Sequence, residues 1–145
     1  MIKKCSLINS FFVLFYLLGF SQNALKQNES IDLFSEEALL QNVRTLSSDG
    51  FEGRRTGTQG ADKAKQYIIN QFQINNVLPF CTNFEQRFSF FIKRKNYDGT
   101  NILGLIQGTD NPEKYIVISA HYDPEGFTEG LIYNGADDDA SGIGA

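Results

Sequence analysis

The sequence contains few cysteines and histidines, the residues from which crosslinks and many metal sites are built. It has two cysteines and one histidine in 145 residues. Cys5 lies close to the amino terminus, so a chain that loses this segment keeps only Cys81 and cannot form an internal disulfide. A catalytic thiol needs a basic partner, and a small buried apolar residue is the simpler interpretation of Cys81.

The sequence also lacks an apolar run long enough to span a bilayer. Its amino-terminal apolar run covers residues 11–20, whereas a membrane helix needs about 20 such residues. Lys3 and Lys4 precede the run, and a serine and a glutamine follow it. This pattern predicts a signal peptide over residues 1–20 and a secreted or periplasmic protein, with no stable membrane insertion after processing.

An excess of positive charge is missing as well. The chain has 13 Lys and Arg against 17 Asp and Glu, a net charge of −4. Removing residues 1–20 removes two lysines and no acid, which leaves 11 basic against 17 acidic residues, a net charge of −6. This charge argues against nucleic acid and against anionic membranes as partners. The sequence gives no indication of oligomeric state.

The length is that of one domain, with a polar leader expected over residues 21–34 and the folded region over 35–145. A capping serine at Ser35 and apolar residues at helical spacing predict a helix over 36–47. A glycine-rich, serine-rich loop follows, and a second amphipathic helix is predicted over 60–75.

The apolar period changes from 3.6 to 2 after Pro79, which indicates β-strands. We expect a half-buried strand near residues 84–93, a turn at Asp98 and Gly99, and a strand over 102–107. The next strand, "YIVISA" over 115–120, has almost no polar alternation. That composition is typical of a central strand covered by helices on both faces.

Two helices, several strands and a buried strand together predict an α/β sandwich. "ASGIGA" at the end of the sequence has the pattern of a first helical turn. Because a helix that should cover the sheet has barely started there, we interpret residues 35–145 as the amino-terminal, truncated part of a domain.

The candidate chemistry follows the apolar strand. His121 comes directly after it, at the carboxyl end of the strand, where ligand sites of α/β sheets gather. Asp123, two residues on, can accept the second ring N–H of a metal-bound imidazole. A lone histidine is more often a structural residue, so the H-x-D spacing by itself is a weak indication of a metal ligand.

Three consecutive aspartates, Asp137, Asp138 and Asp139, strengthen that indication. Adjacent carboxylates repel one another, and a partly buried one needs a cation, backbone N–H groups or a proton. A solvated acidic turn is the simplest alternative. Asp139 is well placed to cap the following helix, which leaves Asp137 or Asp138 free to bind a metal. The EF-hand spacing for calcium is absent, and histidine paired with carboxylates suits zinc.

"VISAHYD" and "YNGADDDASG" resemble the first two metal-site motifs of the co-catalytic di-zinc aminopeptidases, bacterial secreted members in particular. "LSSDGFEGRRTGTQGADKAKQYI" is similar to the segment that opens their catalytic domain, and "NILGLIQGTD" to the strand before their histidine. The resemblance covers roughly residues 40–145. It implies a phosphorylase/hydrolase-like zinc exopeptidase fold, a three-layer sandwich with a mixed, mostly parallel central sheet.

The resemblance also implies residue roles. His121 would bind one of two Zn²⁺ ions, Asp138 would bridge both, and Asp123 would be the catalytic partner that orients His121. The peptide bond between Asp138 and Asp139 is expected to be cis. The expected activity is hydrolysis of amino-terminal residues from peptide substrates. In family members the general base, the second histidine and the other ligands lie beyond the position of Ala145, so the residues present would form an incomplete site.

Two alternatives stay open. One is a single-zinc glutaminyl cyclase-like acyltransferase, whose relatives carry a different acidic motif after the histidine. The other is a non-catalytic binding domain of the same fold. The chain also departs from many bacterial members by reading "HYDPEGF", where Pro124 and Glu125 put the substrate preference in doubt. Arg54 and Arg55 could bind a substrate carboxylate, but we favour their interpretation as solvated loop charges.

Overall fold

Two capped helices organise the part of the chain that the computed structural model describes, residues 35–145. Helix α2 spans Glu36–Leu46, and the hydroxyl oxygen of Ser35 accepts from its third residue, Ala38, at 3.2 Å. Helix α3 spans Gln59–Ile74 and is capped in the same way by Thr58. Both predicted helices are therefore confirmed to within one residue at each end. The predicted signal peptide and the leader over 21–34 lie outside the described residues.

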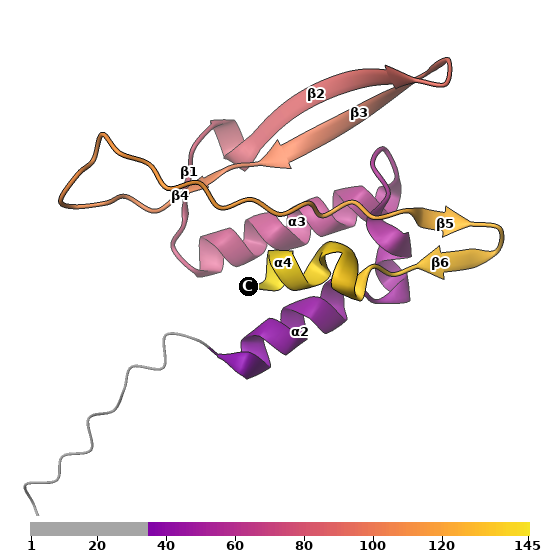
Figure 1. Ribbon diagram of the computed structural model, residues 1–145, viewed down its shortest axis with the longest axis horizontal. Helices are drawn as coiled ribbons and strands as arrows, with labels where there is room; N and C mark the ends of the chain where they lie inside the picture. Colours follow the sequence, from indigo (N-terminus) through magenta and orange to yellow (C-terminus); the bar gives the residue numbers. More distant parts are fainter. Residues whose placement is uncertain (1–34) are drawn as a thin grey trace, which may run out of the picture. The chain divides into compact units, whose positions relative to one another are not determined.

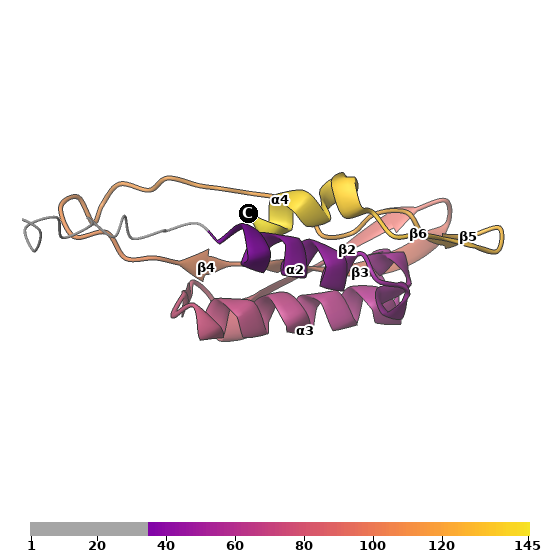
Figure 2. The ribbon, with the colours of Figure 1, turned by 90° about the horizontal axis from the view of Figure 1, so that it is seen from below.

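The core lies where these helices meet the carboxyl-terminal turns. Leu46, Ala64 and Ala140 are almost completely buried there. Ala140 ends a π-helical turn, η4 (Ala136–Ala140), which leads into the short helix α4 (Ser141–Gly144). Figures 1 and 2 show α4 lying beside α2. The helical turn predicted from "ASGIGA" is thus confirmed. Within residues 35–145, no helix is both long enough and apolar enough to cross a membrane.

The loop between the helices is more regular than its composition predicts. It contains 3-10 turns, η2 (Asp49–Arg54), and packs against a small hairpin of β5 (Gly126–Thr128) and β6 (Leu131–Tyr133). Gly53 makes this approach possible: its φ is 63°, and a Cβ atom there would lie 2.6 Å from the carbonyl oxygen of Tyr133. A side chain at this position would push the loop away from the hairpin.

The longest ribbon is the hairpin of β2 (Glu85–Ile92) and β3 (Lys95–Ile102), visible at the top of Figure 1. Its turn is formed by Lys93 and Arg94, both with positive φ. The turn predicted at Asp98 and Gly99 is therefore wrong, because these residues lie within β3. Gly99 faces Phe88 across the hairpin, and the Phe88 ring occupies the space where a Cβ atom would be. The glycine permits ring packing here and does not mark a turn.

The strand predicted over residues 102–107 is formed only in part. Ile102 ends β3, and β4 (Gly104–Leu105) pairs with β1 (Leu78–Pro79). All three ribbons of residues 35–145 are two-stranded and antiparallel. This part of the chain thus combines helices with small antiparallel sheets, and the mostly parallel central sheet of the predicted three-layer sandwich is not formed by these residues.

The apolar segment over residues 115–120 accounts for this difference. It was predicted as a central strand, but it forms no strand in the described part of the chain. Ile116 and Ile118 are 95% and 93% exposed. A strand exists only through hydrogen bonds to a neighbouring strand, and none of the ribbons of residues 35–145 includes this segment. The burial that the composition predicted is therefore wrong for this segment in residues 35–145.

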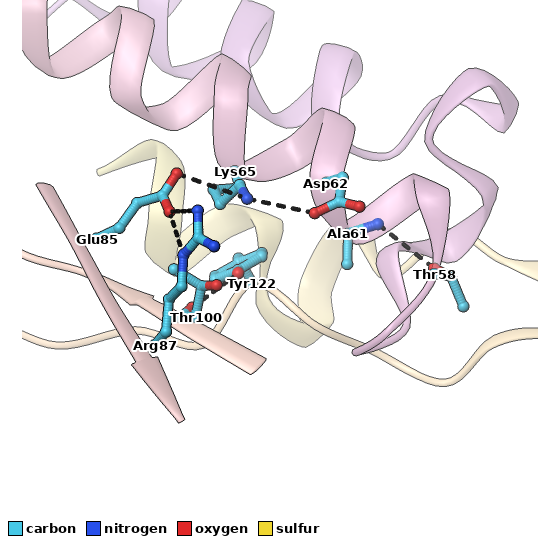
Figure 3. Close-up of polar contacts among 8 residues, drawn as sticks. All are labelled: Thr58, Ala61, Asp62, Lys65, Glu85, Arg87, Thr100 and Tyr122. Atoms are coloured by element: carbon cyan, nitrogen blue, oxygen red, sulfur yellow. Dashed lines mark hydrogen bonds and ion pairs between the residues drawn. The ribbon is translucent and has the colours of Figure 1, made fainter. Parts of the chain in front are cut away.

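A chain of charges fixes the β2–β3 hairpin to α3 (Figure 3). Glu85 at the start of β2 accepts two hydrogen bonds from Arg87, at 2.8 and 2.9 Å, and lies 3.6 Å from the Lys65 ammonium of α3. Lys65 in turn lies 3.3 Å from Asp62. The hydrogen bonds from Arg87, followed by the positive charge of Lys65, lower the pKa of Glu85 below its ordinary value.

We predict that Glu85→Gln lowers the free energy of unfolding by about 1 kcal/mol at neutral pH. Because the folded-state pKa of Glu85 is lowered, its contribution is present above the unfolded-state pKa and is lost as the pH falls through the folded-state value. Thermal unfolding of the variant and the wild type at about pH 7 and at about pH 3 measures this contribution. The difference between the variant and the wild type should be smaller at the acidic pH. The exposed Glu113, changed to Gln, is the control. A deficit of the same size at both pH values would contradict the prediction.

Candidate metal centre

The imidazole of His121 lies between two carboxylates. Its Nε2 is 3.0 Å from Oδ1 of Asp138, and its Nδ1 is 3.8 Å from Oδ1 of Asp123. The three side chains are partly exposed, with Asp138 the most exposed at 75%. The structure therefore brings together all three residues that the sequence analysis singled out, with one carboxylate at each ring nitrogen. Their roles as metal ligands and as orienting partner stay predictions.

The turn that carries the aspartates separates their side chains. Gly135 adopts a left-handed conformation, and its carbonyl oxygen accepts from the N–H of Ala140 at 3.1 Å, which closes the π-helical turn η4. The Asp139 carboxylate accepts from the N–H of Gly142 at 2.9 Å, so the predicted capping role of Asp139 is confirmed. The peptide bond between Asp138 and Asp139 is cis, as expected. Asp138 is the member of the triplet that faces His121.

Tyr122 anchors the histidine segment to the hairpin. Its hydroxyl donates to the carbonyl oxygen of Thr100 in β3 at 2.8 Å, as Figure 3 shows, and its ring packs on the core cluster. Burial, with a smaller contribution from the charge of Asp123, raises the pKa of Tyr122 to about 12. The hydroxyl is therefore a proton donor throughout the physiological range.

Arg54 fixes the main chain on both sides of the site. It is completely buried, and its guanidinium donates to four carbonyl oxygens. Nε donates to Tyr122 at 3.0 Å, Nη2 donates to Gly135 at 2.9 Å, and Nη1 donates to Asn134 at 2.8 Å and to Leu46. Tyr122 follows His121 directly, and Gly135 lies three residues before Asp138. One planar cation therefore fixes the histidine segment relative to the aspartate turn.

Burial lowers the pKa of Arg54, and the carboxylates of Asp123 and Asp138 oppose this shift. The guanidinium stays charged, since the ordinary pKa of arginine is far above neutrality. A buried charge has to be compensated by hydrogen-bond acceptors, which the four carbonyl oxygens provide. The interpretation of Arg54 as a solvated loop charge is wrong, whereas its neighbour Arg55 is exposed as expected.

Thr56 reaches the site from the same loop. Its hydroxyl donates to Oδ2 of Asp123, the carboxylate oxygen that does not face His121. The sequence analysis did not identify Thr56, nor the anchoring roles of Arg54 and Tyr122. The loop sequence "GRRTG" contains Arg54 and Thr56, but nothing in the sequence distinguishes Arg54 from Arg55. The signal for Tyr122 was its position within "HYD", between two candidate site residues.

The donors fit part of a zinc site. An imidazole nitrogen and a carboxylate oxygen are zinc ligands, and at 3.0 Å apart the Nε2 of His121 and the Oδ1 of Asp138 can both lie about 2 Å from one ion. Zinc takes four ligands, however. Within residues 35–145, no group of three or more histidine, cysteine or acidic side chains is arranged to hold a metal ion. The described residues thus supply two facing donors.

Comparison with known proteins connects this geometry to a class of enzyme. Residues 101–145 match the family model for Peptidase family M28. The matched region contains His121, Asp123 and the aspartate turn, and it includes β4, β5, β6 and the final helix. No curated protein matches the chain. The similarity supports a zinc-dependent peptidase at the level of the family and reaches no individual enzyme.

We predict that Tyr122→Phe lowers the free energy of unfolding by about 1 kcal/mol, because the Thr100 carbonyl oxygen loses its donor in a partly buried place. The matched control is Tyr115→Phe, which removes a hydroxyl from a side chain that is 66% exposed. Denaturant unfolding of both variants measures the difference. Equal stabilities of the two variants would show that the Tyr122 hydroxyl does not anchor the segment.

Proposed function

We propose that this chain is the amino-terminal part of the catalytic domain of an exported zinc aminopeptidase, which hydrolyses amino-terminal residues from peptides. The observation that carries the proposal is the contact of 3.0 Å between Nε2 of His121 and Oδ1 of Asp138. Both residues of this contact lie within the part of the chain that matches Peptidase family M28, and they are 17 positions apart in the sequence. A solvated acidic turn gives no reason for this carboxylate to face the only histidine.

In this proposal, His121, through Nε2, and Asp138, through its carboxylate, would hold the zinc. Asp123, whose Oδ1 lies 3.8 Å from Nδ1, would orient the imidazole and favour the tautomer that leaves Nε2 free as a ligand. The carboxylates also carry the negative charge that a dication site requires. The remaining ligands and the general base would be groups other than those described, since residues 35–145 supply two facing donors.

When bound, the zinc ions would polarise the scissile carbonyl group and activate a water molecule for attack. The residues of this chain contribute by fixing where the candidate ligands lie. The histidine and the aspartate turn are held relative to each other through the main chain by Arg54, and the exposed side chains leave room for a peptide to approach. The three-layer sandwich belongs to the same proposal, with segment 115–120 as a central strand once its neighbours are present.

We predict that His121→Ala and Asp138→Asn each reduce bound zinc and lower turnover by at least about a hundredfold in the full-length protein, including any residues that follow Ala145 in its gene. Turnover is measured with a chromogenic aminoacyl substrate, and zinc by atomic absorption. Both side chains are partly exposed, so the thermal midpoint of the metal-free protein should change little. Asp110→Asn, which alters an exposed turn, is the control.

Retained turnover in either variant would refute the assignment of these residues. Zinc binding without peptidase activity in the wild type would instead favour a non-catalytic domain. A single tightly held zinc, together with cyclisation of amino-terminal glutamine, would favour the acyltransferase.

Export is part of the proposal and is tested separately. Expression in a secreting host should release a protein that lacks about the first 20 residues, which amino-terminal sequencing identifies. Leu14→Arg, which interrupts the apolar run, should leave the unprocessed chain in the cell. Recovery of intact Met1 on the released protein would contradict cleavage.

A further inference from the structure

The orientation of Asp123 depends on a residue outside the segment that matches the family. One carboxylate oxygen, Oδ1, lies 3.8 Å from Nδ1 of His121, and the other, Oδ2, accepts the hydrogen bond from Thr56. Thr56 precedes residues 101–145 by a wide margin in the sequence. The Asp123 side chain is 42% exposed, so burial alone does not fix its rotamer. The Thr56 hydroxyl is the group from another loop that restrains it.

Thr56 is itself held at both ends. Two residues earlier, the completely buried Arg54 fixes the main chain through its four carbonyl acceptors. Two residues later, Thr58 caps α3, and its N–H donates to the carbonyl oxygen of Arg55 at 3.1 Å, which closes a turn around Thr56. A threonine side chain has few rotamers because it branches at Cβ. The hydroxyl is thus presented to Asp123 from a fixed point of the chain.

The choice of Asp123 oxygen that accepts from Thr56 affects the orientation of the His121 ring. A carboxylate that is free to rotate would turn into solvent, away from Nδ1, whereas one held at Oδ2 keeps Oδ1 3.8 Å from that nitrogen. A carboxylate held on the Nδ1 side favours the tautomer in which Nε2 carries the lone pair. Nε2 is the nitrogen that faces Asp138. The effect of Thr56 therefore passes through Asp123 and His121 to the position that a metal would occupy.

We propose that Thr56 is a positioning residue of the zinc site, which holds the Asp123 carboxylate against His121 so that Nε2 is oriented toward the metal. This inference rests on the proposed function. It assigns no contact between Thr56 and the metal or the substrate. It makes the "RRTG" loop part of the site even though that loop contains none of the ligands.

The test uses full-length protein and Zn²⁺ alone, titrated in competition with a chromophoric chelator. Thr56→Val keeps the branched shape and removes the donor, and it should weaken zinc binding by about tenfold, the lower end of the effect of changing an outer partner of a ligand. Thr56→Ser keeps a hydroxyl and should recover most of the affinity. The matched control is Thr45→Val, which removes a hydroxyl from the last turn of α2, where it accepts from Gln41.

Two further measurements separate positioning from folding. The thermal midpoints of metal-free Thr56→Val and Thr45→Val should agree, because each loses one hydroxyl with a single side-chain partner. With a peptide substrate and subsaturating zinc, kcat of Thr56→Val should fall in parallel with zinc occupancy while KM stays unchanged, since no substrate contact is lost.

Zinc affinity of Thr56→Val equal to that of the wild type would overturn the inference, and so would an equal loss in Thr45→Val. In both cases the proposed function would stand, because both comparisons are made with a wild type that binds zinc and is active. A wild type that binds no zinc would overturn the proposed function and this inference together.

Discussion

The structure depends on a single buried cation. The guanidinium of Arg54 has five N–H donors in one plane, and it makes four hydrogen bonds to carbonyl oxygens from three separate segments. These segments are the end of α2, the histidine segment and the turn before the aspartates. Because the acceptors belong to the main chain, the contact specifies where the backbone runs and leaves the neighbouring side chains free for chemistry. Glycine at position 53 allows the loop to come close enough for this contact.

The aspartate triplet divides structural and chemical work among neighbouring residues. Asp139 caps α4 and Asp138 faces His121, while the main-chain oxygen of Asp137 accepts from the hydroxyl of Ser141 at 3.2 Å. Three like charges in a row are tolerated because Asp137 and Asp138 are exposed to solvent, and the Asp139 carboxylate accepts from a main-chain N–H. The same arrangement explains why small residues surround the triplet: a side chain at Gly142 would occupy the space of the Asp139 carboxylate.

The sequence predicted best what depends on neighbours along the chain. Caps such as Ser35 and apolar periodicity give the helices, and the i, i+2 spacing brings Asp123 to the same side as His121. It predicted less well what depends on distant partners. The turn at Lys93 and Arg94 contains no glycine, whereas Gly99 makes room for the opposite ring of Phe88 and does not form a turn. Arg54 is buried only because carbonyl oxygens up to 81 residues away converge on it, and no local pattern encodes that convergence.

Segment 115–120 leads directly into His121 and leaves its isoleucines in water. Its amide and carbonyl groups belong to none of the ribbons of residues 35–145, so they are open to pairing with any extended peptide. In concentrated solution such a segment favours association between chains. The candidate metal ligand His121 is therefore attached directly to an exposed segment that can pair with other chains.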